Sequence, residues 1–187
     1  WALVFRDDAA AVFVHRGGSL DAVADSFAYR LVAAGNERLP RFAALVQRVP
    51  QARALARAEL ERMIAGSPLN ARAHSDLATL AWIDGDRAAT RAHLDAALAV
   101  DPRTFGAHRR LGYLELAENR PRAAIHAFER ELALGGDPVD SYVKLGEAWE
   151  RLDDRKRAAG WYARELARRP DNAVARAALT RLQAGLQ

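Results

Sequence analysis

The chain has 187 residues, half of them hydrophobic and 28% charged, and it has no cysteine, so it can bury a core but forms no disulfide or cysteine-ligated zinc site. The net charge of +4 is spread evenly, with nine basic and seven acidic residues in 1–70 and nineteen and seventeen in 71–187. A nucleic-acid-binding protein would concentrate basic residues in a stripe or tail, so we expect no nucleic-acid partner.

The chain opens at Trp1, without an initiator methionine and without a basic leader. We therefore expect a processed or excised piece of a longer protein. No apolar run approaches the roughly 18–20 residues of a membrane span. We predict no span within this chain, although a segment upstream of it could provide a tether.

Residues 1–36 are predicted to form a β-hairpin followed by a helix. Residues 1–6 and 11–16 are rich in β-branched and aromatic residues, and Asp7-Asp8 separates them, as is typical of a hairpin. Because an isolated hairpin is only marginally stable, it either packs on adjacent helices or belongs to a larger sheet. The helix is predicted over about 20–34, with an apolar face and a C-cap made of Leu20, Val23, Phe27, Leu31 and Gly35.

Residues 37–70 are interpreted as a degenerate pair of helices that ends at Ser67-Pro68. The helices are predicted over 40–49 and 51–65. Leu60 and Ala56 occupy slots that recur at a fixed spacing further along the chain, which is why this segment counts as a repeat.

A period of 34 residues governs the chain from residue 71 to residue 172. Three kinds of position keep this spacing: a leucine, the small residue after it, and a large residue in the second half of each unit. They are Leu77, Leu111 and Leu145; Ala78, Gly112 and Gly146; and Leu94, Phe128 and Tyr162. Each unit contains two apolar patterns of helical spacing, so we predict three helix–turn–helix repeats over 71–104, 105–138 and 139–172.

Turn residues divide the helices. Glycine or asparagine ends a helix and aspartate or proline begins one, which predicts turns at 84–86, 118–121 and 153–154. Asp101-Pro102 and Arg169-Pro170 are expected to end the second helices, because proline disfavours helix in the residue before it; the middle repeat has Gly136 and Pro138 in that region. A last helix over about 171–185, in the capping segment 173–187, is expected to cover the final apolar face, with Asp171 or Asn172 as N-cap.

This pattern resembles the tetratricopeptide repeat (TPR) family, in which Leu-Gly is followed by an aromatic residue, Ala, Phe or Tyr, and Pro. The third repeat matches best, at Leu145-Gly146, Trp149, Ala158, Tyr162 and Pro170. The resemblance implies an all-α solenoid, a right-handed superhelix of paired helices, behind the small hairpin–helix element. Two slots depart from the family pattern: an early aromatic slot holds His74 and His108, and a late alanine slot holds Glu131 and Glu165.

No residue pattern points to catalysis, a cofactor or a metal. The five histidines form no His-x-x-x-His pair, and the chain has no phosphate-binding glycine loop and no Gly-x-Ser-x-Gly motif. His74 and His108 are interpreted as packing residues in equivalent slots, where they would be near neighbours. We therefore predict that the chain is not an enzyme.

In the TPR family the first helix of each repeat lines a concave face, where a peptide or a partner helix binds. The resemblance therefore implies a partner-binding set of Arg72, Ser75, Thr79 and Trp82, then Arg109, Arg110, Tyr113 and Leu116, and then Val143, Lys144 and Glu147. The carboxylate clamp of chaperone-adaptor members is not matched, because among its five positions only Lys144 keeps the expected charge. Arginines beside aromatic residues favour an interface, and we expect an acidic–hydrophobic peptide as partner.

Two functions stay open at this point. The first is a non-catalytic scaffold that binds a protein or peptide. The second comes from residues 1–16, which resemble the strands after the last membrane span of bacterial polytopic membrane glycosyltransferases, some of which carry a C-terminal TPR outside the cytoplasm. That resemblance implies the extracytoplasmic, periplasmic tail of a membrane enzyme whose catalytic part is not in this chain; a cytoplasmic location is the alternative.

Overall fold

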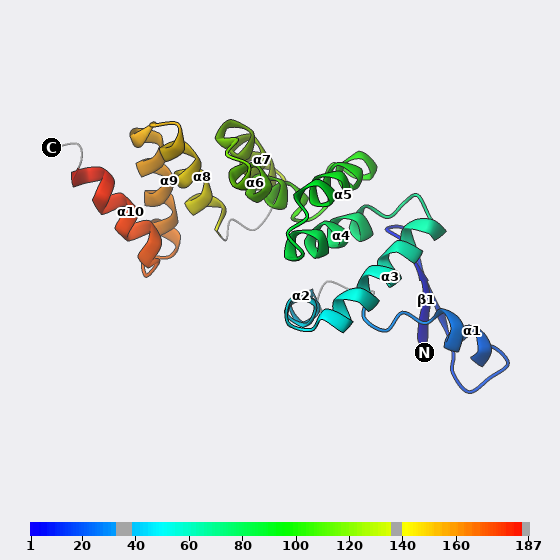
Figure 1. The fold of residues 1–187 in the computed structure, drawn as a ribbon. Helices are drawn as coiled ribbons and strands as arrows, with labels where there is room; N and C mark the ends of the chain where they lie inside the picture. Colours follow the sequence, from blue (N-terminus) through cyan, green and yellow to red (C-terminus); the bar gives the residue numbers. More distant parts are fainter. Residues whose placement is uncertain (33–38, 136–139, 185–187) are drawn as a thin grey trace. The chain divides into compact units, whose positions relative to one another are not determined.

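The computed structural model describes residues 1–32, 39–135 and 140–184, which contain ten helices and one two-stranded sheet (Figure 1). The chain divides into two compact units, Trp1–Thr104 and Phe105–Gln187. The division falls where the predicted repeats 71–104 and 105–138 meet.

The first unit begins with the predicted hairpin. Strands β1 (Ala2–Arg6) and β2 (Ala11–Val14) pair antiparallel, with an irregularity in register between Leu3 and Phe5. The Asp7 carboxylate closes the turn, because its Oδ1 accepts hydrogen bonds from the backbone N–H groups of Ala9 and Ala10. Helix α1 (Asp21–Phe27) packs Ala24 against buried residues of both strands, so the hairpin is covered by an adjacent helix.

The helix predicted over 20–34 is wrong in length and in its buried face. Helix α1 ends at Phe27, and Leu20, Val23 and Phe27 are exposed, although they were expected to face a core. The chain leaves helical geometry at Ala28 because the backbone N–H groups that follow bind a side chain instead. Those of residues 30–32 all donate to the carboxylate of Glu59, at 2.6–3.0 Å. The predicted C-cap, Gly35, lies outside the described residues.

Four helices complete the first unit. Helices α2 (Leu39–Arg48) and α3 (Pro50–Gly66) match the predicted pair within one residue, and α4 (Ala71–Ile83) and α5 (Arg87–Val100) form the first repeat. The core is made by residues of α2, α3 and α4 together with Val32. The largest of its fully buried side chains are Val46, Leu60, Leu77 and Leu80.

The second unit contains five helices that follow the 34-residue period. They are α6 (Ala107–Ala117), α7 (Pro121–Ala133), α8 (Ser141–Arg151), α9 (Arg155–Arg168) and α10 (Ala173–Ala184). Each helix packs on the next in the chain, and the two cores are centred on Phe128 and Tyr162. Helix α10 contributes Ala175, Ala178 and Leu182 to the second of these cores, which confirms it as the helix that covers the last repeat.

The close packing at the small positions explains the glycines. A Cβ atom on Gly112 would lie 2.7 Å from the Phe128 ring, and one on Gly146 would lie 2.6 Å from the Tyr162 ring. Only a residue without a side chain therefore lets the two helices of these repeats approach so closely. Both pairs join the positions that the sequence period placed in equivalent slots.

The turn between the two helices also repeats. Gly85, Asn119 and Asp153 are 34 residues apart, and all three adopt a left-handed backbone conformation, with φ of 78°, 56° and 57°. The helices that follow start as predicted: the carboxylates of Asp86 and Asp154 cap α5 and α9, and Pro121 is the first residue of α7. The sequence signals for these turns are therefore confirmed.

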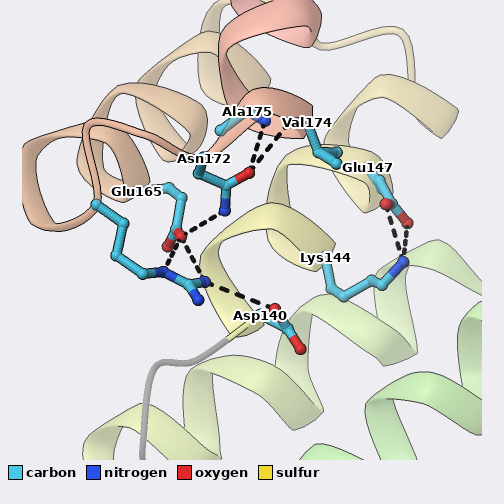
Figure 2. A network of polar contacts seen from close by, with 8 residues as sticks. Asp140, Lys144, Glu147, Glu165, Asn172, Val174 and Ala175 are labelled. Carbon is cyan, nitrogen blue, oxygen red and sulfur yellow. Dashed lines mark hydrogen bonds and ion pairs between the residues drawn. The ribbon is translucent and has the colours of Figure 1, made fainter.

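The two glutamates in the late alanine slot are buried and hydrogen-bonded. The Glu131 carboxylate accepts a hydrogen bond from the backbone N–H of Arg109, at the start of α6. Glu165, which is 0% exposed, binds the side chains of Arg169 and Asn172 at 2.6 and 2.7 Å. Asn172 in turn caps α10 by accepting from the N–H groups of Val174 and Ala175 (Figure 2). These carboxylates thus fix the ends of neighbouring helices where the family pattern has alanine.

Candidate partner-binding surface

The predicted site residues on α4 meet different fates. Trp82 is 43% exposed and presents its ring to solvent, as expected for a contact residue. Ser75 is 1% exposed, so it offers no surface to a partner. The Thr79 hydroxyl donates to the Ser75 carbonyl, and the Arg72 guanidinium contacts the Asp76 carboxylate at 3.4 Å.

The turn of the hairpin lies against the N-terminal end of α4. The Asp8 carboxylate accepts from the backbone N–H of Arg72, and the Ser67 hydroxyl donates to Asp7. The Asp8 N–H donates to the Leu69 carbonyl. The first turn of α4 is therefore already occupied by residues of the same chain, which the sequence did not reveal.

On α6, two of the four predicted residues lie in packed surroundings. Leu116 is buried in the core around Phe128, so it is not a surface contact. Tyr113 stands edge-on to Phe128, with ring centroids 5.5 Å apart, and is half-buried. Burial, followed by the negative charge of Asp140, raises the pKa of the Tyr113 hydroxyl, so it remains a neutral hydrogen-bonding group.

The two arginines of α6 are partly accessible. Arg110 donates to the Phe105 carbonyl at 3.4 Å. For the Arg109 guanidinium, the described part of the chain provides no carboxylate within ion-pairing distance, although its backbone N–H binds Glu131. Arg109 is thus the more available positive charge on this helix.

On α8, Val143 is buried in the core around Tyr162, so this predicted contact is also an internal one. Lys144 and Glu147 are half-exposed and form an ion pair, with Nζ 2.8 Å from a carboxylate oxygen (Figure 2). Each therefore partly neutralises the charge that the other would present to a partner.

An open cavity of about 670 Å³ lies between α8 and α10, and we call it the α8–α10 groove. Its apolar part comes from Val174, Ala177 and Ala178, and Val174 is 61% exposed. Its polar rim comes from residues of both helices and from the Tyr162 hydroxyl: Glu147, Glu150, Arg151 and Arg181. Glu147 is thus the one residue of the predicted set that lines this groove.

Glu150 organises the polar side of the groove. One of its carboxylate oxygens accepts from the Tyr162 hydroxyl at 2.6 Å, and the other pairs with Arg181 at 2.7 Å. Burial, and then this hydrogen bond, raise the pKa of Tyr162 far above its usual range. Arg181 keeps 64% of its side chain exposed despite the ion pair. Because a guanidinium has five N–H donors, Arg181 can bind a second carboxylate.

The analysis of the first helices alone missed Glu150, Val174 and Arg181. Val174 and Arg181 lie on α10, which the sequence identified only as a cap for the last apolar face. A signal for Val174 was present, since it is an apolar residue in the first turn of a helix whose buried positions are Ala175, Ala178 and Leu182.

The structure also corrects the predicted neighbour of His74. His74 on α4 lies beside His93 on α5, with the two Nδ1 atoms 3.3 Å apart, whereas His108 belongs to the second unit. Burial lowers the pKa of both imidazoles, and each is further lowered by a nearby positive group, His93 for His74 and Arg57 for His93.

Two searches of residues 1–32, 39–135 and 140–184 gave no candidate. No group of three or more histidine, aspartate, glutamate or cysteine side chains is placed to hold a metal ion. None of the helices in this part combines the length and the apolar character needed to cross a bilayer.

Comparison with known proteins identifies the fold. A crystal structure of MamA matches with a TM-score of 0.67 at 18% identity, over 82% of this chain and 85% of that chain. A second MamA crystal structure matches with a TM-score of 0.57 at 17% identity, over 73% and 78% of the two chains. No family model and no curated protein sequence matches. The fold is therefore an all-α, TPR-like helical repeat with a small β-hairpin.

Proposed function

We propose that this chain is a non-catalytic scaffold that binds a segment of a partner protein along the first helices of its second unit. The α8–α10 groove carries this proposal, because it is an open cavity of about 670 Å³ between a repeat helix and the capping helix. Helices α6 and α8 are in contact, so the groove continues towards Arg109.

The chemistry of this surface suits a segment with an apolar residue next to an acidic one. An apolar side chain would cover Val174 and Ala177, which removes apolar area from water. A carboxylate would bind Arg181 at one end or Arg109 at the other through charge-assisted hydrogen bonds. Because these arginines are exposed, the charged contacts are weakened by salt.

A displayed library of random twelve-residue peptides, selected against the whole chain, tests this proposal. We expect enriched sequences that place Asp or Glu beside a large apolar residue. Arg109→Glu should weaken their binding by about tenfold, as expected for loss of a charge-assisted hydrogen bond. Val174→Asp should have a similar effect without harming α10, because an acidic residue is favourable in the first turn of a helix.

Two matched variants control for charge and for the new carboxylate. Arg130→Glu reverses an exposed charge on α7, and Ala123→Asp adds a carboxylate in the first turn of that helix. Neither residue lines the α8–α10 groove, so both variants should bind selected peptides as the wild type does. If all four variants bind alike, the partner surface lies elsewhere and the proposal fails.

We propose as a second candidate that the chain is the extracytoplasmic tail of a membrane enzyme. The exposed apolar side chains of the hairpin and α1 support it: Trp1, Val12, Phe13, Leu20, Val23 and Phe27. They make the N-terminal element the part of the described chain most suited to contact a further apolar surface. The reading frame upstream of Trp1 tests this candidate, since it requires several apolar spans there, and a short leader without spans would refute it.

A further inference from the structure

Two histidines from adjacent helices face each other in the first repeat. His74 on α4 and His93 on α5 have ring centroids 5.5 Å apart, with the ring planes inclined at 38°. Their Nδ1 atoms are 3.3 Å apart, and both side chains are half-buried. Neither ring is part of the proposed partner surface of the second unit.

This nitrogen–nitrogen distance is the one that a chelated metal ion requires. Two imidazole nitrogens bound at about 2.0–2.1 Å to a tetrahedral ion lie about 3.3 Å from each other. The two helices that carry the rings are fixed by buried side chains one turn away, Leu77 on α4 and Leu94 on α5. The pair is therefore held near the required spacing before any ion binds, which reduces the free-energy cost of forming the site.

We propose that His74 and His93 form a two-histidine site for a borderline divalent ion, Cu²⁺, Ni²⁺ or Zn²⁺. Neutral imidazole is a preferred ligand of these three ions, whereas Mg²⁺ and Ca²⁺ require oxygen ligands. No third protein ligand is placed at the pair within the described residues, so water fills the remaining positions. The ion bridges α4 and α5 of one repeat and stabilises the folded first unit.

The protons balance without any co-reactant. In the ion-free pair, one Nδ1 carries a hydrogen and the other accepts it. When the ion binds, the first ring carries its proton on Nε2 instead, exchanged through solvent, and both Nδ1 lone pairs face the ion. Each ring stays neutral, so no net proton is released when both start neutral.

The charged groups near the pair favour this state. Burial lowers the pKa of both rings, so they are unprotonated at neutral pH. Asp8 from the hairpin turn acts on His74, whereas Glu61 and Arg57 from α3 act on His93 with opposite signs. Two carboxylates against one guanidinium leave the surroundings favourable to a cation.

Calorimetric titration of the untagged whole chain with Cu²⁺, Ni²⁺ and Zn²⁺ at pH 7 tests the proposal. We expect one equivalent to bind, and His74→Gln and His93→Gln to weaken its binding by at least about tenfold each. His126→Gln, on the exposed face of α7, and His15→Gln, beside Trp1, are the matched controls and should leave the binding unchanged.

A second measurement does not depend on the folding of the variants. The electron paramagnetic resonance spectrum of the Cu²⁺-loaded wild type should show two imidazole nitrogens bound to the same ion. A spectrum with no or one imidazole nitrogen, or the absence of binding to the wild type, shows that the histidines form only a hydrogen-bonded pair. Loss of the site in His15→Gln instead of His93→Gln would also overturn the proposal.

Discussion

The two repeats of the second unit and the N-terminal element of the first unit are held together by different kinds of contact. In the repeats, large apolar side chains pack against small ones at equivalent positions, as at Gly112 with Phe128 and Gly146 with Tyr162. In the N-terminal element, carboxylates bind backbone N–H groups, and several large apolar side chains stay exposed.

This difference determines how far each region can be derived from its sequence. The glycine–aromatic contacts join residues only 16 positions apart, and they recur with the period of the chain. The Glu59 contacts join residues 27–29 positions apart, and the hydrogen bond from Ser67 to Asp7 spans 60 positions. Nothing in a local pattern announces such single contacts.

The largest expected effect tests the packing of the repeats. Gly146→Leu should lower the free energy of unfolding by about 3 kcal/mol or more, because even a Cβ atom would overlap the Tyr162 ring at 2.6 Å. Denaturant unfolding followed by circular dichroism measures the change.

Gly160→Leu is the matched control for this prediction. Gly160 is exposed on α9, and a Cβ atom there would meet no other atom within 4 Å. Leucine should therefore stabilise the helix by roughly 0.5–1 kcal/mol, because it has the higher helix propensity. If both substitutions stabilise the protein, the close approach at Gly146 is refuted.

The next effect tests the N-terminal element. Glu59→Gln should destabilise it by about 2 kcal/mol, because an amide presents one acceptor oxygen where three backbone N–H groups need two. Hydrogen exchange should accelerate at Arg30, Leu31 and Val32. The control is Glu61→Gln on the exposed face of the same helix, which should leave these amides protected; equal protection in both variants would contradict the prediction.

The sequence was informative where contacts repeat. The three left-handed turn residues, the caps at Asp86 and Asp154 and the helix pairs of 71–172 all follow from a period of 34 residues. The helix over 20–34 was overestimated because its apolar spacing is regular, whereas backbone donors bound by a distant carboxylate end it at Phe27. Periodicity therefore predicted that residues 21–27 are helical but not where the helix stops.

For the candidate site, the sequence identified helices better than it identified exposed side chains. The predicted surface set includes Ser75, Leu116 and Val143, which are buried in the structure. A fixed spacing gives the face of an isolated helix, but the packing of the neighbouring helix decides which of its residues reach solvent. The groove residues on α10 were missed for a related reason, since the family pattern assigns contacts only to the first helices of repeats.

A smaller effect tests how the last helix is attached to the repeats. Asn172→Ala should cost about 1 kcal/mol, because it removes the N-cap of α10 and the hydrogen bond to the buried Glu165. Asp171→Ala is the control, since that exposed neighbour was the alternative cap in the sequence but α10 is capped by Asn172. A larger loss of thermal stability in Asp171→Ala would reverse this assignment.

The smallest effect concerns the left-handed turn residue, which is glycine in the first repeat and aspartate in the third. Asp153→Gly should raise the free energy of unfolding by roughly 0.5 kcal/mol, because glycine adopts positive φ without the steric cost that a Cβ atom brings. The gain is reduced by loss of the exposed contact between Asp153 and Arg155, and such surface pairs contribute little. Gly85→Asp is the reciprocal variant: no atom lies near its Cβ position, so the left-handed strain alone should lower the stability by a similar amount. Thermal unfolding of both variants measures these opposite shifts. Shifts of the same sign would show that the two turns are not equivalent, although they lie two periods apart.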